Sequence, residues 1–273
     1  MENNLFPILL NGCGNEEIAT PNGYARNKPW EFKNVDYIKS KGINRCYIIF
    51  HYSPEKNKFL KKLKVIFNFH SGSTVTKVFL YKNALIAISP LGAPAAAKLM
   101  EELSVFGITE FISLGSAGCL NSNIKDKFLL VEKAIRDEGV SYHYLEPSTY
   151  VPTNENLNNE LELFLKNKDL PYVRGTTWTS DGFYRETTQK VEMAKKLGGQ
   201  AVEMECAAWC AVAKYRGYKF TQILYFSDLL NSLEWTRILK YKRKSNDEKR
   251  YMASLLVKEM IDVYSNKNKQ LII

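Results

Sequence analysis

Strand-like and helical runs alternate along most of this 273-residue chain. Runs rich in β-branched and aromatic residues occur at 45–52, 65–70, 74–81, 84–89, 110–114, 128–135, 200–204 and 221–226. Helical patterns occur at 95–106, 156–166, 188–197, 206–215 and 246–264. This order predicts an α/β fold, a three-layer αβα sandwich with a mixed central β-sheet.

Length and composition indicate a single domain across residues 1–273. With 45% hydrophobic residues the chain can bury a large core, and α/β domains of this size are often undivided. No apolar stretch approaches the roughly 20 residues that cross a bilayer, and the first residues lack a basic leader. We therefore expect a cytoplasmic protein with no membrane partner.

Charge and cysteine content argue against two classes of site. The net charge of +9 is concentrated at 61–64 and 240–250, and neither stretch carries a known nucleic-acid-binding motif. Because Asp247 and Glu248 interrupt the second stretch, we expect a solvated helix face and no nucleic-acid partner. The five scattered cysteines have no metal-ligand spacing, which predicts reduced thiols and no metal site.

Acidic residues stand where predicted strands end. The stretch AVEMECAA at 201–208 places Glu203 and Glu205 around Met204, between a strand and a helix, and Asp228 follows the next apolar run. Half-buried carboxylates are costly unless something binds them, and α/β sheets bind ligands beyond the carboxyl ends of their strands. Each acid alone is better explained as a helix cap. Their combination with the segments below favours a ligand site.

Two glycine-containing turns are predicted near the same edge. Gly92 lies between a strand and a helix, and Gly115 and Ser116 follow the run at 110–114. Glycine permits close backbone approach to a ligand, and exposed amides attract anions or sugar hydroxyls. Neither turn has P-loop or dinucleotide-binding spacing, so each alone is also compatible with an ordinary tight turn.

Five segments, taken in order, resemble the nucleoside phosphorylase and nucleosidase superfamily. They are GSAG at 115–118, RDEGVSYHY at 136–144, TTWTSDGFYRET at 176–187, AVEMECAA at 201–208 and Ser-Asp at 227–228. Each segment alone is weak, whereas the ordered set, covering roughly residues 84–235, is specific. The resemblance implies cleavage of a nucleoside N-glycosidic bond, at a site completed by a neighbouring subunit.

The resemblance also implies roles for single residues. Glu205 would accept hydrogen bonds from the ribose hydroxyls, with Met204 packed beneath the sugar. Phe183 would stack on the base, and Asp228 would protonate or hydrogen-bond the base as it departs. Ser116 would touch phosphate or the attacking water. The other residues expected to bind substrate are Ser180, Asp181, Tyr184, Glu203, Gly115 and Gly92.

The chemistry of bond cleavage agrees with two acids that have separate tasks. The bond breaks through an oxocarbenium-like state, so a carboxylate under the ribose stabilises positive charge while an acid neutralises the leaving base. Asp228 would have to hold a proton at neutral pH, and apolar neighbours such as Phe226 and Leu229 favour that. An acid here suits a purine ring nitrogen. The glutamine and arginine by which uridine-specific relatives read uracil are not evident after Phe183.

The sequence departs from the superfamily where phosphate is held. Phosphorylases usually carry an arginine two residues before the Gly-Ser turn, where this chain has Ser113, and the N-terminal segment has no Gly-Asp-Pro loop. Phosphate would need Arg26, Arg45, Arg136 or an arginine of a neighbouring subunit.

Three functions stay open under this resemblance. We expect a purine nucleoside phosphorylase with inorganic phosphate as co-substrate and no cofactor. A nucleosidase that uses water is the alternative, and a non-catalytic nucleoside-binding protein is disfavoured by the presence of both Glu205 and Asp228.

The aromatic content predicts a homo-oligomer, a dimer or a hexamer. The chain has 16 tyrosines and 14 phenylalanines. Tyr142, Tyr144 and Phe183 lie in expected site loops, where burial within one subunit is incomplete and interfaces are typical.

Overall fold

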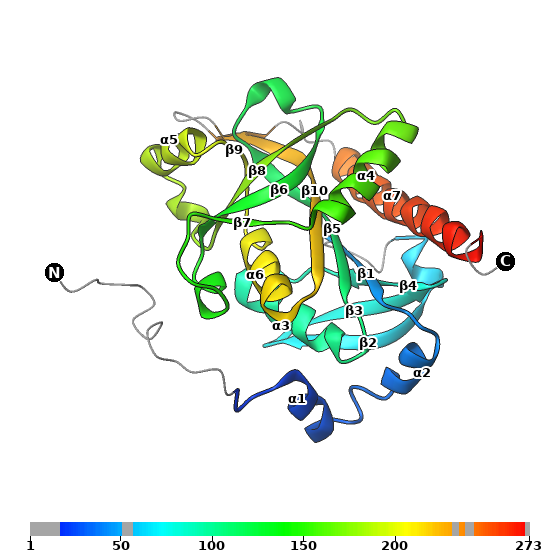
Figure 1. Cartoon of the computed structure of the whole chain (residues 1–273). Helices are drawn as coiled ribbons and strands as arrows, with labels where there is room; N and C mark the ends of the chain where they lie inside the picture. The colour runs from blue at the N-terminus through cyan, green and yellow to red at the C-terminus, as the bar shows by residue number, and fades with distance from the viewer. Residues whose placement is uncertain (1–16, 51–56, 231–234, 238–242, 271–273) are drawn as a thin grey trace.

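One mixed β-sheet organises the described part of the chain, which comprises residues 17–50, 57–230, 235–237 and 243–270 of the computed structural model (Figure 1). The strand order is β11-β10-β6-β8-β9-β5-β1-β4-β3-β2, with β7 paired to β6 and a further pairing of β10 with β5. The strands are β1 Arg45–Ile49, β2 Lys64–Ser71, β3 Thr74–Tyr81, β4 Ala84–Ile88, β5 Glu110–Cys119, β6 Phe128–Asp137, β7 Tyr150–Pro152, β8 Tyr172–Ser180, β9 Gly199–Glu203, β10 Lys219–Leu230 and β11 Trp235–Arg237.

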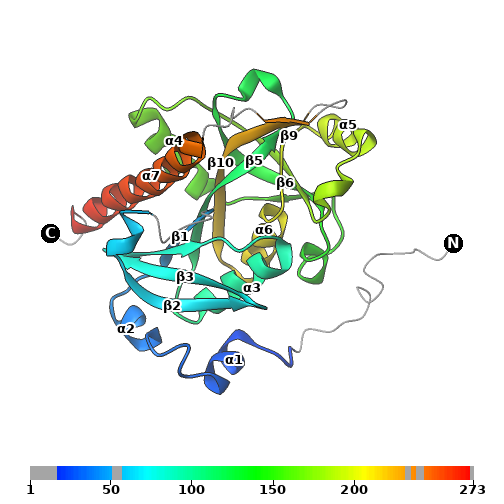
Figure 2. The ribbon, with the colours of Figure 1, turned by 180° about the vertical axis from the view of Figure 1, so that it is seen from behind.

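Helices cover both faces of this sheet (Figures 1 and 2). They are α1 Pro21–Asn27, α2 Val35–Ser40, α3 Ala93–Ser104, α4 Glu155–Asn167, α5 Thr188–Lys196, α6 Cys206–Arg216 and α7 Arg243–Gln270. In β1, Cys46 and Ile48 pack into the core of α3 and α6, whereas Tyr47 and Ile49 pack into the core of α4 and α7. Alternate residues of a strand point to opposite faces, so the predicted three-layer αβα sandwich is confirmed.

The strand β8 was not predicted from the sequence. Its segment contains threonines, an arginine and a glycine rather than a continuous apolar run, yet it lies between β6 and β9 in the sheet. Thr177 and Thr179 are fully buried there because their hydroxyls find hydrogen-bond partners in the fold. A polar strand of this kind is stabilised by partners that are distant in sequence.

The predicted Gly-Ser turn after residue 114 is wrong. The strand β5 continues through Gly115 and Ser116 to Cys119, because β10 pairs with it in parallel along this whole length. The strand β10 likewise continues past its predicted end at 226 to Leu230, with a register shift between Phe226 and Asp228. Ser116 and Asp228 are therefore presented by a sheet rather than by loops.

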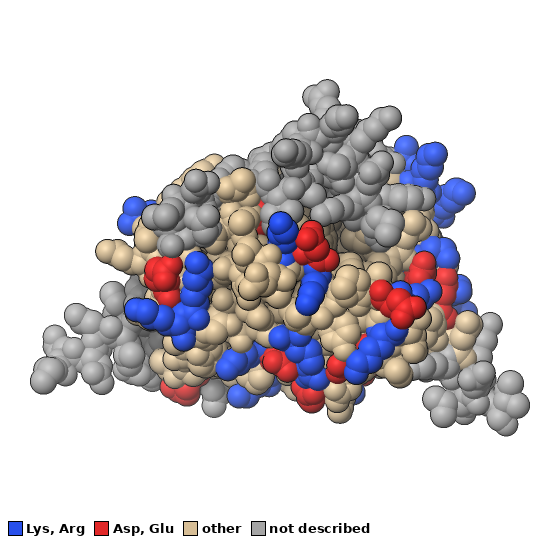
Figure 3. Space-filling model, turned by 90° about the horizontal axis from the view of Figure 1, so that it is seen from above, with Lys and Arg blue, Asp and Glu red and all other residues tan. Residues whose placement is uncertain are grey.

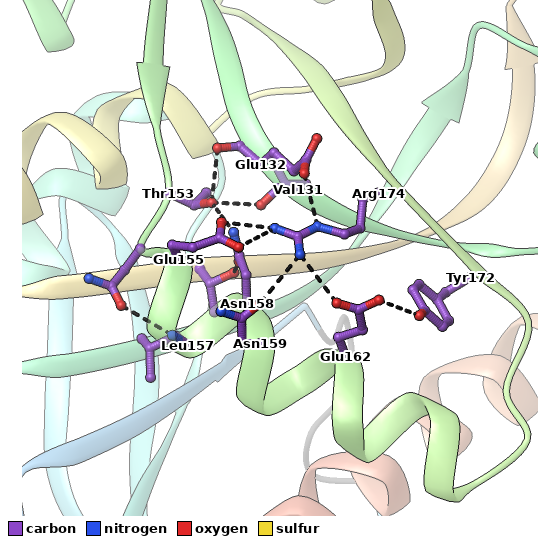
Figure 4. A network of polar contacts seen from close by, with 12 residues as sticks. Val131, Glu132, Thr153, Glu155, Leu157, Asn158, Asn159, Glu162, Tyr172 and Arg174 are labelled. Atoms are coloured by element: carbon purple, nitrogen blue, oxygen red, sulfur yellow. Dashed lines mark hydrogen bonds and ion pairs between the residues drawn. The ribbon is translucent and has the colours of Figure 1, made fainter.

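A network of ion pairs joins β8 to its neighbours away from the carboxyl ends of the strands (Figure 4). Arg174 binds Glu132 of β6 and both Glu155 and Glu162 of α4. The hydroxyl of Tyr172 donates to Glu162 at 2.6 Å. These contacts fix the start of β8 against α4, and they leave Arg174 with no role near the predicted site.

Basic and acidic side chains are interspersed over the view of Figure 3. No helix among these residues is both long and apolar enough to cross a membrane.

Arg45 anchors the amino-terminal ends of β1 and β5. Its guanidinium is 3% exposed and donates to Glu110 at 2.7 Å and to Glu160 of α4 at 2.5 Å. The ring of Tyr264 in α7 lies 3.9 Å from the guanidinium carbon. Because Arg45 and Glu110 are the first residues of their strands, this cluster lies at the end of the sheet opposite to the predicted site.

We expect Arg45→Ala to lower the free energy of unfolding by roughly 3 kcal/mol, because it leaves the half-buried Glu110 without its main partner. Lys219→Ala is the matched control, since Lys219 also binds Glu110, at 3.0 Å, from a half-exposed position. It should cost less than about 1 kcal/mol. Urea unfolding of both variants measures the difference, and equal small losses would contradict the buried role of Arg45.

Candidate active site

Strand register brings the predicted acidic segments to one edge of the sheet. Thr179 of β8 lies opposite Glu203 of β9, and Val202 of β9 lies opposite Gly118 of β5. Gly118 in turn pairs with Asp228 of β10. The three strands that carry the predicted acids and Ser116 are therefore direct neighbours.

Glu203 is a buried carboxylate with hydrogen bonds inside the fold. One of its oxygens accepts from the hydroxyl of Thr179 at 2.6 Å, and the other accepts from the amides of Glu205 at 2.8 Å and Cys206 at 2.7 Å. Thr179 Oγ1 also accepts from the amide of Ala207 at 2.9 Å. Glu203 thus caps the first turn of α6 and ties it to β8.

Glu205 faces the turn that precedes α3. Its Oε1 accepts from the amide of Gly92 at 2.6 Å. Gly92 has φ of 87° and ψ of 152°, a conformation that is essentially restricted to glycine. The predicted ligand turn at Gly92 and the predicted ribose-binding carboxylate at Glu205 therefore meet, although they are 113 residues apart in sequence.

Burial and the neighbouring charge of Glu203 raise the pKa of Glu205 above its ordinary value, against the opposing effect of the Gly92 amide. Burial also raises the pKa of Glu203, while the hydrogen bond from Thr179 and two backbone amides oppose the shift. Of the two, Glu203 has the more complete set of donors, so we take it as the charged member that acts on Glu205.

Asp228 lies against Gly118 on the neighbouring strand. A Cβ built on Gly118 would lie 3.3 Å from Asp228 Oδ2 and 2.9 Å from Val202 Cγ1, so only glycine leaves room for both side chains. Ser227 Oγ donates a hydrogen bond to Asp228 Oδ1. Ser116, half-buried, stands two residues before Gly118 on the same strand.

The residues predicted around the base divide into turn-forming and exposed side chains. Ser180 is buried and its hydroxyl accepts from the amide of Gly182 at 3.2 Å, and Asp181 accepts from the amide of Gly139 at 2.9 Å. Phe183 and Tyr184 are 51% and 93% exposed, with their rings in an edge-to-face contact at 5.1 Å. Phe183 is thus available to stack on a ligand or a second subunit. Tyr144, by contrast, packs against Tyr215 of its own chain.

Two of the arginines proposed for phosphate are engaged in the fold. Arg45 lies in the buried cluster described above. Arg136 is buried, and it donates to the hydroxyls of Ser141 and Ser148 and to the carbonyls of Leu145 and Glu146. Burial lowers its pKa. Arg26 is exposed on α1. Ser113, in the arginine position, is 2% exposed in β5.

Two features of this edge were missed in the sequence. The hydroxyls of Thr177 and Thr179 alternate along β8, a period-two pattern that could have indicated a strand with one polar face. Glu186, a half-buried residue just before α5, was not among the predicted site residues. Among the described residues no cluster of three His, Cys, Asp or Glu side chains could hold a metal ion.

We expect Gly92→Ala to lower the free energy of unfolding by roughly 1–3 kcal/mol, because alanine does not adopt this backbone conformation without strain. Gly115→Ala is the control, since its added Cβ would meet atoms only at ordinary distances of 3.8 and 3.9 Å. Thermal and urea unfolding compare the two. Equal stability would show that the Gly92 backbone is not constrained as described.

Comparison with known proteins identifies the family of this chain. Residues 50–261 match the phosphorylase superfamily. The chain is 26% identical to a DeoD-type purine nucleoside phosphorylase of Shewanella oneidensis over 207 residues, which are 75% of this chain and 84% of that protein. It is 31% identical to the guanosine phosphorylase of Halorubrum lacusprofundi over 137 residues, which are 49% of this chain and 56% of that protein. A DeoD-type relative of Aliivibrio fischeri is 31% identical over 45% of this chain, and the match spans only about half, 53%, of that relative.

Solved structures show the same fold. The uridine phosphorylase of Vibrio fischeri superposes with a TM-score of 0.63 at 25% identity, covering 79% of this chain and 90% of that one. The futalosine hydrolase of Helicobacter pylori, in its native form, gives 0.62 at 19% identity, with 81% and 98% coverage. With a family match over most of its length and the predicted segments gathered at one edge of the sheet, this chain belongs to the phosphorylase superfamily.

Proposed function

We propose that this chain is a purine nucleoside phosphorylase, which transfers the ribosyl group from a purine base to phosphate. The observation that carries the proposal is the pair of acids on neighbouring strands and turns, with Glu205 held at the Gly92 amide and Asp228 held over Gly118. A nucleoside laid along this edge would have its sugar near one acid and its base near the other.

The proposed roles follow from the charge that develops as the bond breaks. The Glu205 carboxylate accepts hydrogen bonds from the ribose hydroxyls and stabilises the oxocarbenium-like sugar, with Met204 beneath it. Asp228 acts on a ring nitrogen of the departing base, and Phe183 stacks on that base. Glu203 holds Glu205 in place and does not contact the substrate in this scheme.

Phosphate is the first candidate for the group that attacks the sugar. Two relatives similar in sequence are named purine nucleoside phosphorylase and guanosine phosphorylase. Ser116 would contact the phosphate. Arg45 and Arg136 are bound to other groups of the fold. The negative charge of the phosphate would therefore be balanced by Arg26, by a neighbouring subunit or by residues outside the described ranges.

Water is the second candidate, and one observation favours it. A buried serine, Ser113, stands where phosphorylases of the superfamily carry the arginine that holds phosphate, so the described part of β5 supplies no positive charge to the acceptor. The same acids would then hydrolyse the bond.

We expect base release from inosine or guanosine to require added phosphate and to yield ribose 1-phosphate. The assay follows the free purine by chromatography in phosphate-free buffer with and without added phosphate. Equal release under both conditions would replace phosphorolysis by hydrolysis. Binding without any release would leave only the nucleoside-binding function. Turnover of uridine with inert inosine and adenosine would contradict the purine assignment.

Glu205→Gln should lower kcat by roughly 10²-fold, because it removes the charge beneath the sugar while keeping the shape of the side chain. Because burial and Glu203 raise the pKa of Glu205, wild-type activity should fall with decreasing pH earlier than an ordinary glutamate would cause.

Glu203→Gln is the contrast for this prediction. Its amide group cannot accept from every donor now bound to Glu203, so we expect a loss of roughly 1–3 kcal/mol in stability and a smaller loss in rate. Rates are compared at a temperature where urea unfolding shows both variants folded. Equal, small effects on the rate at both positions would return the whole Glu-Met-Glu motif to a structural role.

A further inference from the structure

Exposed lysines gather at the start of β2 and at both ends of α2, which lies beside the β2–β3 hairpin in both views of the chain (Figures 1 and 2). Lys61 and Lys62 end the 3-10 turn directly before β2, and Lys64 is the first residue of that strand. Lys33 stands just before the N-cap of α2, and Lys41 stands at its C-cap. We refer to these five residues as the lysine ridge.

Two contacts hold α2 along the outer edge of β2. This strand is the last in the described sheet order, and β3 pairs with it on one side. On its other side, the side-chain amide of Asn34, the N-cap of α2, donates to the carbonyl of Ile66 at 2.6 Å. Further along the helix, the ring of Tyr37 lies beside the ammonium group of Lys64. The fold therefore brings lysines of two separate segments to one surface.

Tyr37 is the aromatic member of this surface. Its side chain is 41% exposed, and the ammonium groups of Lys64 and Lys41 lie 4.9 and 5.8 Å from the centre of its ring. Such cation–π contacts hold the lysine side chains in place without neutralising their charge. A planar group can thus stack on the exposed part of the ring, next to two positive charges.

The fold leaves the charge of the lysine ridge largely unbalanced. None of its five lysines forms an ion pair within the described ranges. The helix α2 contributes one carboxylate, Asp36, and the nearby Glu31 is bound to Lys28 at 3.2 Å. At the other end of the hairpin the pattern differs, because Lys82 is bound to Asp262 of α7. A surface of one sign without counter-charges attracts a polyanion.

The kind of polyanion follows from the ring and from what is absent beside it. Proteins bind single-stranded nucleic acid by combining lysines that follow the phosphates with aromatic rings on which bases stack. A membrane-binding face would add exposed aliphatic side chains. The nearest, Val65, pairs with Phe79 of the α4 and α7 core, so it points to the opposite face of the strand from Lys64.

The lysine ridge is remote from the proposed nucleoside site. The strand β2 pairs antiparallel with β3, β3 pairs antiparallel with β4, and β4 pairs parallel with β1. Because β1 and β5 are also parallel, the start of β2 lies at the amino ends of these strands. The nucleoside is proposed to bind at their carboxyl ends.

We propose that the lysine ridge binds single-stranded nucleic acid, with phosphates at the lysines and one base stacked on Tyr37. The expectation of no nucleic-acid partner rested on the stretch 61–64 without its neighbours. The fold adds an aromatic ring and two lysines from an earlier segment. This binding does not depend on the proposed function, so failure of the base-release assay would leave it standing.

The first experiment measures the fluorescence anisotropy of a labelled oligouridine of about 20 nucleotides, titrated with the full chain at several salt concentrations. The logarithm of the binding constant should fall with the logarithm of the salt concentration with a slope of roughly −2 to −3.5, as for three to five neutralised phosphates. Lys41→Glu/Lys64→Glu should lower the affinity by roughly tenfold or more at low salt.

The matched control is Lys196→Glu/Lys214→Glu, which changes the net charge equally at exposed lysines of α5 and α6. It should keep the affinity within about twofold of the wild type, because its lysines lie outside the ridge. Urea unfolding of both double variants checks that each is folded. Equal losses in the two would show that net charge alone attracts the oligonucleotide, and would overturn the proposal.

Tyr37→Leu tests the stacked base separately from the phosphates. It should lower the affinity by roughly fivefold or more and leave the salt slope unchanged, because the lysines stay in place. An unchanged affinity would overturn the assignment of a single strand. The absence of any binding at low salt would overturn the whole proposal. So would sedimentation with phosphatidylserine vesicles that requires Lys41 and Lys64 while oligouridine is not bound, since the surface would then serve a membrane.

Discussion

The buried carboxylate of Glu203 is the contact on which the candidate site depends. It joins the end of β9 to Thr179 of β8 and to the first amides of α6, so three elements meet at one side chain. Satisfying two helix amides with a carboxylate stabilises both the helix end and the charge. Its bond to the Glu205 amide also fixes the backbone from which the Glu205 side chain reaches the turn before α3.

The position of Glu205 shows how that contact affects the chemistry. The Glu205 carboxylate accepts a hydrogen bond from the Gly92 amide and is half-buried. Burial and the neighbouring charge of Glu203 raise the pKa of Glu205. The same edge carries Asp228, and burial together with the charge of Asp228 raises the pKa of Glu186, the half-buried residue before Thr187. Carboxylates at this edge could stabilise the positive charge that is proposed to develop on the sugar.

Two of the arginines considered as phosphate ligands, Arg45 and Arg136, form hydrogen bonds within the fold instead. Arg45 and Arg136 are both buried and donate four hydrogen bonds each, Arg45 at the amino ends of the strands and Arg136 near the end of β6. A buried guanidinium with most of its five N–H donors engaged in this way would have to break some of those contacts to bind a phosphate. The choice between phosphate and water therefore depends on groups other than these two side chains.

The sequence by itself determined the alternation of strands and helices and the strand-to-helix change within AVEMECAA. Both are local patterns, because hydrophobic periodicity and the apolar run of β9 are read within a few residues. It also determined that acids stand at strand ends, and the ordered motifs identified the superfamily that residues 50–261 match.

Only the tertiary structure decided which of these residues meet. Thr179 and Glu203 are 24 residues apart in sequence, and Gly92 and Glu205 are 113 apart, so no local pattern predicts their hydrogen bonds. The polar strand β8, the continuation of β5 through Gly115, and the packing of α5 against Val202 likewise depend on neighbours supplied by distant segments. Burial then set the protonation of the acids, since desolvation is a property of the folded surroundings and not of the residue type.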